Sequence, residues 1–205
     1  MTITNGYCSL VELKTQLGIE LTDTDDDDEL EPVVEAVSRW IDDKLGRRFY
    51  AASETRYFTA TSTDYVIIDD LLSLTTLKTD TSGDGTYNQT WTSSDYRLHP
   101  RNASTDGEPY RMIRRAPQGS YYFPDVLDGV EVTGSFGYAS TTPSAIKQAC
   151  LIASERVWKR KDLIFGTAGN ADLGTIEAII PLSNDGEIMA LLSSISRKWQ
   201  SVRPR

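Results

Sequence analysis

The 205-residue sequence predicts an α+β fold, in which a small α-helical bundle carries an inserted antiparallel β-barrel or sandwich-like domain. Segments with the apolar spacing of amphipathic helices occupy both ends of the chain. The stretch between them is rich in Thr, Ser, Tyr and Gly, and its apolar residues recur at every second position, as in half-buried strands. We therefore expect an N-terminal helical hairpin at 1–54, a β-rich insertion at 55–141, and C-terminal helices at 142–205 that complete the core.

The N-terminal hairpin follows from two helical patterns joined by a short loop. Ser9 and Glu12 form a capping-box pattern that opens a short helix, and Gly18 is placed to end it. The longer helix lies within residues 24–50, where apolar residues recur at three-, four- and seven-residue spacings. Acids crowd its start, where the helix dipole favours negative charge, and Gly46 is placed to end it in a left-handed cap. Such a helix needs partner helices to bury its apolar stripe.

The β-rich insertion is divided into short strands by clusters of turn residues. Its clearest strand is the alternating segment 130–138. Further short strands are predicted at 57–58, 65–68, 73–78, 86–91, 96–98 and 110–113.

Two helices are predicted in the C-terminal segment. Thr142 is a candidate N-cap with Pro143 at the first helical position, and the last helix follows a cap at Asn184 or Asp185. This last helix carries an apolar stripe that either closes the helical core or packs on another subunit or partner. A large aromatic and a basic tail follow the stripe, a combination that interface hot spots favour.

Charge is distributed unevenly along the chain. The net charge is −9, and the segment between Lys14 and Arg39 holds nine acids and no base, so this segment carries the whole excess. The last eighteen residues hold four bases and no acid. This polarity argues against general nucleic-acid affinity and favours an oriented, charge-complementary assembly. The sequence shows no apolar run long enough to span a bilayer and no signal-peptide pattern at its start.

The sequence offers little for catalysis. His99 is the only histidine, which excludes two-histidine metal motifs, and no P-loop, G-x-S-x-G or C-x-x-C motif is present. The loop that starts at Asp80 matches the first half of an EF-hand, but Trp91 stands at position twelve, so a hairpin turn is the favoured interpretation. Cys8 and Cys150 are expected to be buried thiols rather than a disulfide. We therefore assign no catalytic, cofactor-binding or metal-binding residue.

A group of arginines occupies the second half of the β-rich insertion. They would contact phosphate or an acidic partner, or they would pair with acids on neighbouring strands, and we favour pairing. The group consists of Arg97, Arg101, Arg111, Arg114 and Arg115.

The order of these elements resembles the head-to-tail connector (adaptor) proteins of long-tailed bacteriophages. The segment VVEAVSRWIDDKLGRRFY resembles the second helix of that family, and PSAIKQACLIASERVWKRKD and EIMALLSSISRKW resemble its third and terminal helices. The segments LLSLTTLKTD, GTYNQTWTSSDYRLHPRNA and VEVTGSFGYAS resemble the insertion of the larger members. The resemblance covers nearly the whole chain, and its specificity comes from the order and spacing of these segments.

The resemblance implies a structural, non-enzymatic virion protein without a cofactor. Such a protein forms a ring, twelvefold in the virion, that joins the portal protein to the stopper or tail and leaves a channel for passing DNA. It is expected in the virion neck, and in the host cytoplasm during assembly, without a membrane partner. By this resemblance the C-terminal helix would engage the portal through Ile188, Leu191, Leu192, Ile195, Arg197, Lys198, Trp199, Arg203 and Arg205.

The acidic segment suggests a place in such a ring. Sliding DNA should meet repulsion rather than attraction, so we expect acidic residues to face the channel. The alternative is that these acids meet a basic surface of a neighbouring subunit or partner. The residues concerned are Asp25, Asp26, Asp27, Asp28 and Glu29.

Two other functional classes remain as alternatives. A stopper or tail-completion protein would also sit in the virion, although the helical framework disfavours it. A β-domain module would bind a ligand or a host surface through the insertion alone. A hydrolase has no support beyond His99 and scattered acids.

Overall fold

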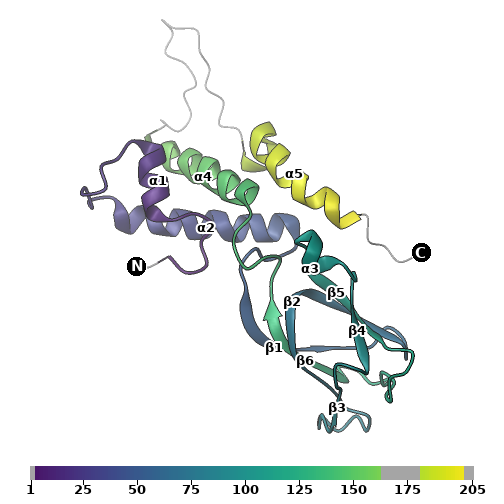
Figure 1. Cartoon of the computed structure of the whole chain (residues 1–205). Helices are drawn as coiled ribbons and strands as arrows, with labels where there is room; N and C mark the ends of the chain where they lie inside the picture. The colour runs from purple at the N-terminus through teal and green to yellow at the C-terminus, as the bar shows by residue number, and fades with distance from the viewer. Residues whose placement is uncertain (1–2, 163–180, 201–205) are drawn as a thin grey trace, which may run out of the picture. The chain divides into compact units, whose positions relative to one another are not determined.

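The structure is a computed structural model that describes residues 3–162 and 181–200, with side chains placed through Lys161 and from Pro181 through Ile195. It divides into two units (Figure 1). The helical unit is built from residues 1–46 and 143–205, and the sheet unit is residues 47–142. The described residues therefore give an α+β protein in which the chain leaves the helical unit, completes a sheet and returns.

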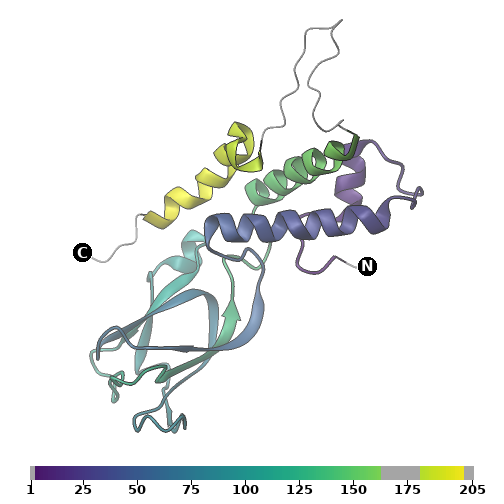
Figure 2. The ribbon, with the colours of Figure 1, turned by 180° about the vertical axis from the view of Figure 1, so that it is seen from behind.

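The helical unit is organised around its third long helix. Its helices are α1 (Leu10–Leu17), α2 (Asp27–Leu45), α4 (Ser144–Lys159) and α5 (Gly186–Gln200). Helix α4 packs against all three of the others, and Figures 1 and 2 show it running beside α2 in both views. Short 3₁₀ turns at Arg160–Asp162 and Leu182–Asn184 lie at the end of α4 and before α5.

Most of the helix ends form as the sequence predicts. The Ser9 hydroxyl accepts the Glu12 N–H while the Glu12 carboxylate accepts the Ser9 N–H, which is a complete capping box. Gly18 and Gly46 end α1 and α2 with φ of 73° and 64°, in the left-handed region that glycine enters without steric cost.

The start of α4 differs from the prediction by one residue. Pro143 is the cap, with ψ at 143°, rather than the first helical residue, and it makes no side-chain cap hydrogen bond because proline has no polar side chain. Its carbonyl accepts the N–H of Lys147, so the helix begins at Ser144. The N-cap predicted at Thr142 is therefore wrong.

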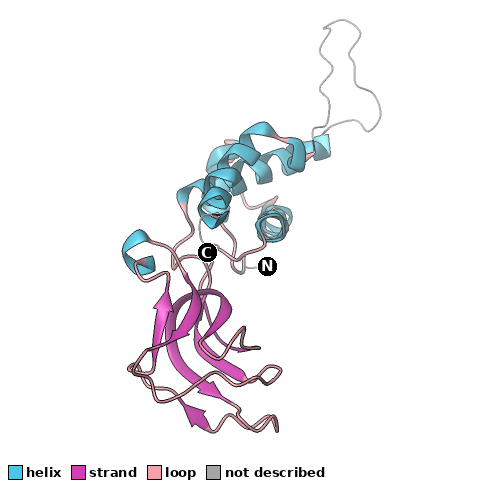
Figure 3. Ribbon diagram, turned by 90° about the vertical axis from the view of Figure 1, so that its right-hand side faces the viewer, coloured by secondary structure: helices cyan, strands magenta, loops and turns pink. Residues whose placement is uncertain are grey.

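The sheet unit contains six antiparallel strands and a short helix. The strands are β1 (Ala52–Phe58), β2 (Tyr65–Thr79), β3 (Gln89–Thr90), β4 (Tyr96–His99), β5 (Tyr110–Arg115) and β6 (Val130–Phe136), and α3 is Ala103–Asp106. Their order is β1-β6-β2-β5-β4, with β3 paired to β2. Figure 3 shows the strands in magenta, gathered in one curved sheet. Among the described residues β1 and β4 each pair with one strand only, so the sheet is open and the expected closed barrel is not observed.

Strand β2 is the longest strand and bends the sheet. The sequence predicts two strands at 65–68 and 73–78, but the structure joins them into one strand of 15 residues. Its first part pairs with β5 and its second part with β6, with register shifts in both ladders. Such irregularities bend a strand and increase its twist. The strand predicted at 86–91 contributes only Gln89 and Thr90.

The core of the sheet unit is formed by apolar side chains on one face of this bent sheet. Val66, Leu71, Ile113, Val132 and Phe136 are buried on its inner face. The connections beside the sheet add stacked aromatic rings, with the centroids of Trp91 and Phe123 4.5 Å apart. These rings are buried as deeply as the strand residues and contribute to the same core.

The chain enters and leaves the sheet unit at neighbouring points. The Tyr138 N–H donates to the Arg48 carbonyl at 2.8 Å, and the rings of Phe49 and Tyr138 lie 5.3 Å apart. The unit starts at Arg47, ahead of the expected start of the insertion at residue 55. None of the described helices combines the length and apolar character that crossing a membrane requires.

Candidate partner-binding surfaces

The apolar stripe of α5 is mostly buried within the helical unit. Ile188, Leu192 and Ile195 are at most 7% exposed, and Leu191 is half-buried. Since α5 packs against α4, these residues close the helical core, which is one of the two alternatives that the sequence leaves open. They do not form an exposed apolar face in this chain.

The remaining residues predicted at the portal contact follow the buried stripe. The backbone of α5 continues through Arg197, Lys198 and Trp199, but their side chains lie outside the described residues. Arg203 and Arg205 also lie outside the described residues.

The start of α5 is anchored to α4 by charge. The Asp185 carboxylate accepts the backbone N–H groups of Glu187 and Ile188 at 3.1 and 3.2 Å, which makes it the N-cap predicted from the sequence. The same carboxylate forms an ion pair with Arg156 on α4, and Arg156 also contacts Glu187 at 2.8 Å. Asp185 is 7% exposed, so this anchor is sheltered from solvent.

The acidic segment is partly neutralised by lysines of its own unit. Lys14, whose side chain is 3% exposed, lies 2.8 Å from Asp27. Lys161 lies 3.6 Å from Asp26 and 3.9 Å from Glu29. Asp25 and Asp28 are exposed. Asp26, Asp27 and Glu29, which are among the acids expected at a DNA channel, therefore contact lysines of the same chain.

The arginine group divides into paired and unpaired members. Arg111 lies 3.2 Å from Glu108, and Arg115 lies 3.5 Å from Asp64. These two arginines therefore pair with acids, but both acids lie in loops next to strands rather than on the neighbouring strands that the sequence predicts. The other three, which are Arg97, Arg101 and Arg114, have no carboxylate partner in the part of the chain that the structure describes.

The register of β4 and β5 places two of these unpaired arginines face to face. Arg97 and Arg114 are directly opposite each other across the antiparallel ladder, and both are exposed. Within the described part of the chain, the hydrogen bonds of the Arg97 guanidinium go to the carbonyls of Ser93 and Tyr96, at 3.2 and 2.8 Å. Like charges in directly opposed positions destabilise a sheet. The sequence alone gave no sign of this juxtaposition, because it depends on the pairing register.

His99 lies beside these arginines. It ends strand β4, where it lies opposite Met112, rather than in the turn-like segment expected from the sequence. Partial burial, together with the charges of Arg114 and Arg101, lowers the pKa of His99. The imidazole is therefore neutral at neutral pH, and the positive charge of the cluster comes from the arginines.

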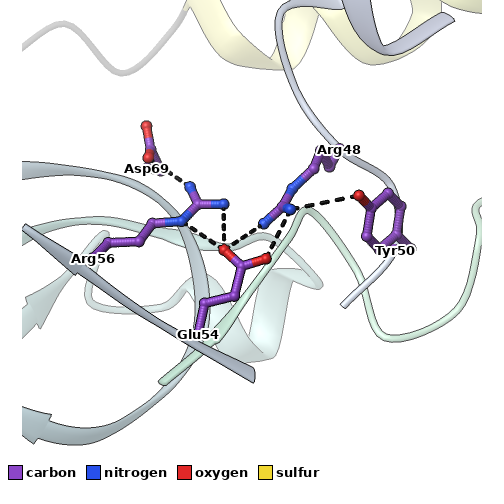
Figure 4. A network of polar contacts seen from close by, with 5 residues as sticks. All are labelled: Arg48, Tyr50, Glu54, Arg56 and Asp69. Atoms are coloured by element: carbon purple, nitrogen blue, oxygen red, sulfur yellow. Dashed lines mark hydrogen bonds and ion pairs between the residues drawn. The ribbon is translucent and has the colours of Figure 1, made fainter. Parts of the chain in front are cut away.

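A second charged network lies around strand β1, and it contains equal numbers of positive and negative side chains. Arg48 donates two hydrogen bonds to the Glu54 carboxylate, at 2.8 and 3.0 Å (Figure 4). Arg56 bridges Glu54 and Asp69, at 2.9 and 2.6 Å. The hydrogen bonds from Arg48 lower the pKa of Glu54 to about 2, against the opposing effect of burial. Two arginines and two carboxylates thus pair with one another near the start of the sheet unit.

In the loop that resembles half an EF-hand, a carboxylate accepts hydrogen bonds from the backbone of the same loop. The Asp80 carboxylate accepts hydrogen bonds from the backbone of Ser82, Gly83 and Gly85. Burial raises the pKa of Asp80, but these hydrogen bonds outweigh it and lower the pKa. Among the described residues, no group of three or more His, Cys, Asp and Glu side chains is arranged to hold a metal ion. Because β2 and β3, on either side of this loop, pair with each other in antiparallel orientation, the loop is the turn of a hairpin.

Comparisons with known proteins agree with this architecture. Residues 7–91 match the family model described as "Phage gp6-like head-tail connector protein". This range runs from α1 through β3 and so includes parts of both units. A search of curated proteins found no match.

Solved structures share the fold over the full length of the chain. The chain resembles a protein in the neck of an empty gene transfer agent (GTA) particle computed with C6 symmetry, with 17% identity and a TM-score of 0.59. A second match, in the neck of a native GTA particle computed with C12 symmetry, has 15% identity and a TM-score of 0.56. Both cover 100% of this chain, and 95% and 94% of the matched chains.

Proposed function

Residues 7–91 carry the phage gp6-like head-tail connector region, as the resemblance of the sequence predicted, and from this premise we propose that the protein is a head-to-tail adaptor. It assembles as a ring, twelvefold in the virion, beneath the portal protein and joins the portal to the stopper or tail. DNA passes through the ring without being held. The match to the connector family is the observation that carries this proposal. The match supports a structural connector of the virion neck, and the adaptor role is the more specific proposal that we add to it.

Two features of the chain support a structural rather than an enzymatic role. The Asp80 loop satisfies its own hydrogen bonds, and the Glu54 network balances its own charges. The remaining distinctive features are two surfaces of opposite charge, the acidic segment and the unpaired arginines. Surfaces of this kind are suited to assembly with other subunits.

Helix α5 is the proposed portal contact. Because Ile188, Leu192 and Ile195 fill the core, the contact is assigned to the residues that follow this stripe. These are the aromatic Trp199 and the basic residues Arg197, Lys198, Arg203 and Arg205. An aromatic anchor beside arginines is a typical composition for an interface hot spot.

The structure also decides how this contact should be tested. Truncation after Gly186 would remove Ile188, Leu192 and Ile195 and expose the core, so it would mix misfolding with lost binding. Removal of residues 197–205 leaves the core stripe intact. The matched control is Lys44→Glu, at an exposed position of α2.

The experiment is a binding assay with purified portal and with DNA-filled, tailless capsids. We expect the full chain and the Lys44→Glu variant to bind saturably at the portal vertex and to form a ring in electron micrographs. Removal of residues 197–205 should abolish this binding, while circular dichroism shows only the small loss of helix signal expected from the last turn of α5 and an unchanged cooperative melting transition. Normal binding by the shortened chain would refute the α5 assignment, and no binding by the full chain would refute the adaptor role.

The acidic residues have two possible places in such a ring. One is the channel wall, where repulsion keeps DNA moving. The other is a basic surface of a neighbour. Because Asp25, Asp28 and Glu29 are exposed while Asp26 and Asp27 are half-buried, the two alternatives differ mainly in what they require of the three exposed acids.

A further inference from the structure

We propose that the unpaired basic cluster of the sheet unit binds the acidic segment of a second copy of this chain. The basic cluster consists of Arg97, Arg101 and Arg114, which lie beside His99, and the acidic segment is residues 23–29. This inference rests on the proposed ring and assigns one of its subunit contacts to named residues.

The first argument is the unfavourable arrangement of charge within the cluster. Arg97 and Arg114 occupy directly opposed positions on β4 and β5, where like charges cost stability. Arg101 follows β4, and both Arg101 and Arg114 lie close enough to His99 to lower its pKa. No carboxylate of the described residues contacts Arg97, Arg101 or Arg114. An anion placed over this cluster would turn the repulsion into attraction.

The second argument is position. Strand β4 pairs only with β5, so it is an edge strand whose outer side is not covered by another strand among the described residues. Edge strands are common sites of contact between subunits, and charged side chains there help to select the partner. The basic cluster therefore lies where a segment of another chain can approach.

The third argument is complementarity within the chain itself. The segment between Lys14 and Arg39 holds nine acids and no base, and it accounts for the whole negative excess of the protein. Asp25 and Asp28, in this segment, are exposed. The lysine contacts of Asp26 and Asp27 fix the segment on the helical unit and leave its outer surface acidic.

A ring of identical subunits needs this kind of pairing. Each subunit of a ring uses two different patches, one for each neighbour, and the two patches must complement each other. The basic cluster and the acidic segment lie in different units of the chain and have opposite charge. Guanidinium groups bind carboxylates with well-directed, charge-assisted hydrogen bonds, which suits a contact that fixes subunit orientation.

The test uses zero-length cross-linking of the full chain. Arg114→Lys keeps the charge and supplies an amine that a carbodiimide joins to a carboxylate in direct contact. Chains labelled with ¹⁴N and with ¹⁵N are mixed at about 50 mM and at about 500 mM salt, because ionic strength screens exposed charge pairs. We expect cross-linked peptides that join position 114 to residues 23–29, with mixed isotope content, at low salt only.

Charge reversal provides the second readout. Arg97→Glu with Arg114→Glu, and separately Asp25→Lys with Asp28→Lys, should each weaken self-association roughly tenfold or more in sedimentation experiments. All four substitutions in one chain should restore it. The control Lys44→Glu with Lys159→Glu makes the net charge more negative by the same amount as Arg97→Glu with Arg114→Glu, at exposed positions outside both surfaces, and should leave association unchanged.

Several outcomes would overturn the inference. If every cross-linked peptide pair carries one nitrogen isotope only, the contact lies within one chain. Absence of the cross-link, or failure of the fourfold variant to restore association, would exclude this pairing. Normal association of the Asp25→Lys, Asp28→Lys chain would instead favour acids that face the channel. If the cross-link is absent while the chain still binds the portal vertex, the contact is wrong and the adaptor role stands. If the wild-type chain does not bind the portal vertex at all, the adaptor role itself is refuted.

Discussion

The sulfur atoms of Cys8 and Cys150 lie 3.4 Å apart in the core of the helical unit, although 142 residues separate them in sequence. Both thiols are buried and free in the structure, and the hydroxyl of Ser38 lies 3.6 Å from the Cys150 sulfur. This pair joins the segment before α1 to α4, so it reports whether the two separate parts of the helical unit are assembled.

We expect both cysteines to resist alkylation in the folded protein. The hydrogen bond with Cys150, together with burial, raises the pKa of the Cys8 thiol and suppresses its reactive thiolate. The same hydrogen bond lowers the pKa of Cys150 to about 7 against the opposing effect of burial, so Cys150 is protected because its side chain is inaccessible to the reagent. Iodoacetamide labelling followed by mass spectrometry should show slow modification in buffer and rapid modification of both residues in denaturant. A small oxidant such as diamide should instead link Cys8 to Cys150 within one chain. Rapid labelling in buffer would contradict the buried arrangement.

The N-cap of α5 yields a prediction about stability. Asp185→Ala removes two hydrogen bonds to the helix start and the ion pair with Arg156, so the free energy of unfolding should fall by about 1–3 kcal/mol. Asp185→Asn, which can still cap the helix, should lose less. Asn184→Ala, at an exposed neighbouring position, is the control and should be close to neutral. Urea denaturation measures all three variants.

The close approach of β6 to β2 yields a prediction for Gly134. A Cβ atom at this position would lie 2.3 Å from the Ser73 carbonyl oxygen, and both partners are backbone in paired strands. Gly134→Ala should therefore destabilise the protein by about 2–4 kcal/mol.

Gly186→Ala is the matched control for Gly134→Ala. Nothing lies within 4 Å of a Cβ atom at position 186, where α5 begins. Thermal unfolding should show a large loss for the first substitution and little change for the second. Equal melting temperatures for the two variants would contradict the close approach.

The Glu54 network predicts how stability depends on pH. The pKa of Glu54 is lowered from an ordinary value of 4.5 to about 2 in the folded protein, chiefly by the hydrogen bonds from Arg48. The unfolded chain therefore binds the proton more readily, so this contribution is complete above pH 4.5 and is lost as the pH falls towards 2.

Glu54→Gln tests this pH dependence. The substitution removes the charge pairs with Arg48 and Arg56, and because the network is partly exposed we expect a cost of about 1 kcal/mol at pH 7. The difference between wild type and variant should shrink between pH 4.5 and pH 2 in denaturant titrations. A difference that stays constant over this range would show that the Glu54 charge does not stabilise the fold.

Sequence patterns predicted the features that depend on local chemistry. The capping box at Ser9 and the left-handed glycines at positions 18 and 46 each depend on a few neighbouring residues. The alternation in β6 follows from one strand that faces a core on one side. The Asp185 cap belongs to the same group, because its hydrogen bonds stay within three residues.

Features that depend on distant pairing could not be predicted in the same way. The sequence predicts two strands where the structure has the single strand β2. Asp69 and Asp70 lie in the middle of this strand, and Asp70 is paired at 2.9 Å with Arg47, which lies 23 residues away. The central role of α4 and the burial of Ile188 and Leu192 depend on which helices meet. The opposition of Arg97 and Arg114 depends on strand register.

The division of the helical unit between two chain segments has a consequence for how the protein is made. On the ribosome, residues 47–142 emerge in full before any of α4 is available, so the sheet can form while the apolar stripe of α2 still lacks its main packing partner. Folding of the helical unit must then close a loop of nearly a hundred residues, an entropic cost that a preformed sheet with adjoining ends at Arg48 and Tyr138 greatly reduces. Early folding of the sheet unit would thus bring together the chain ends that lead to α2 and α4, which are translated far apart.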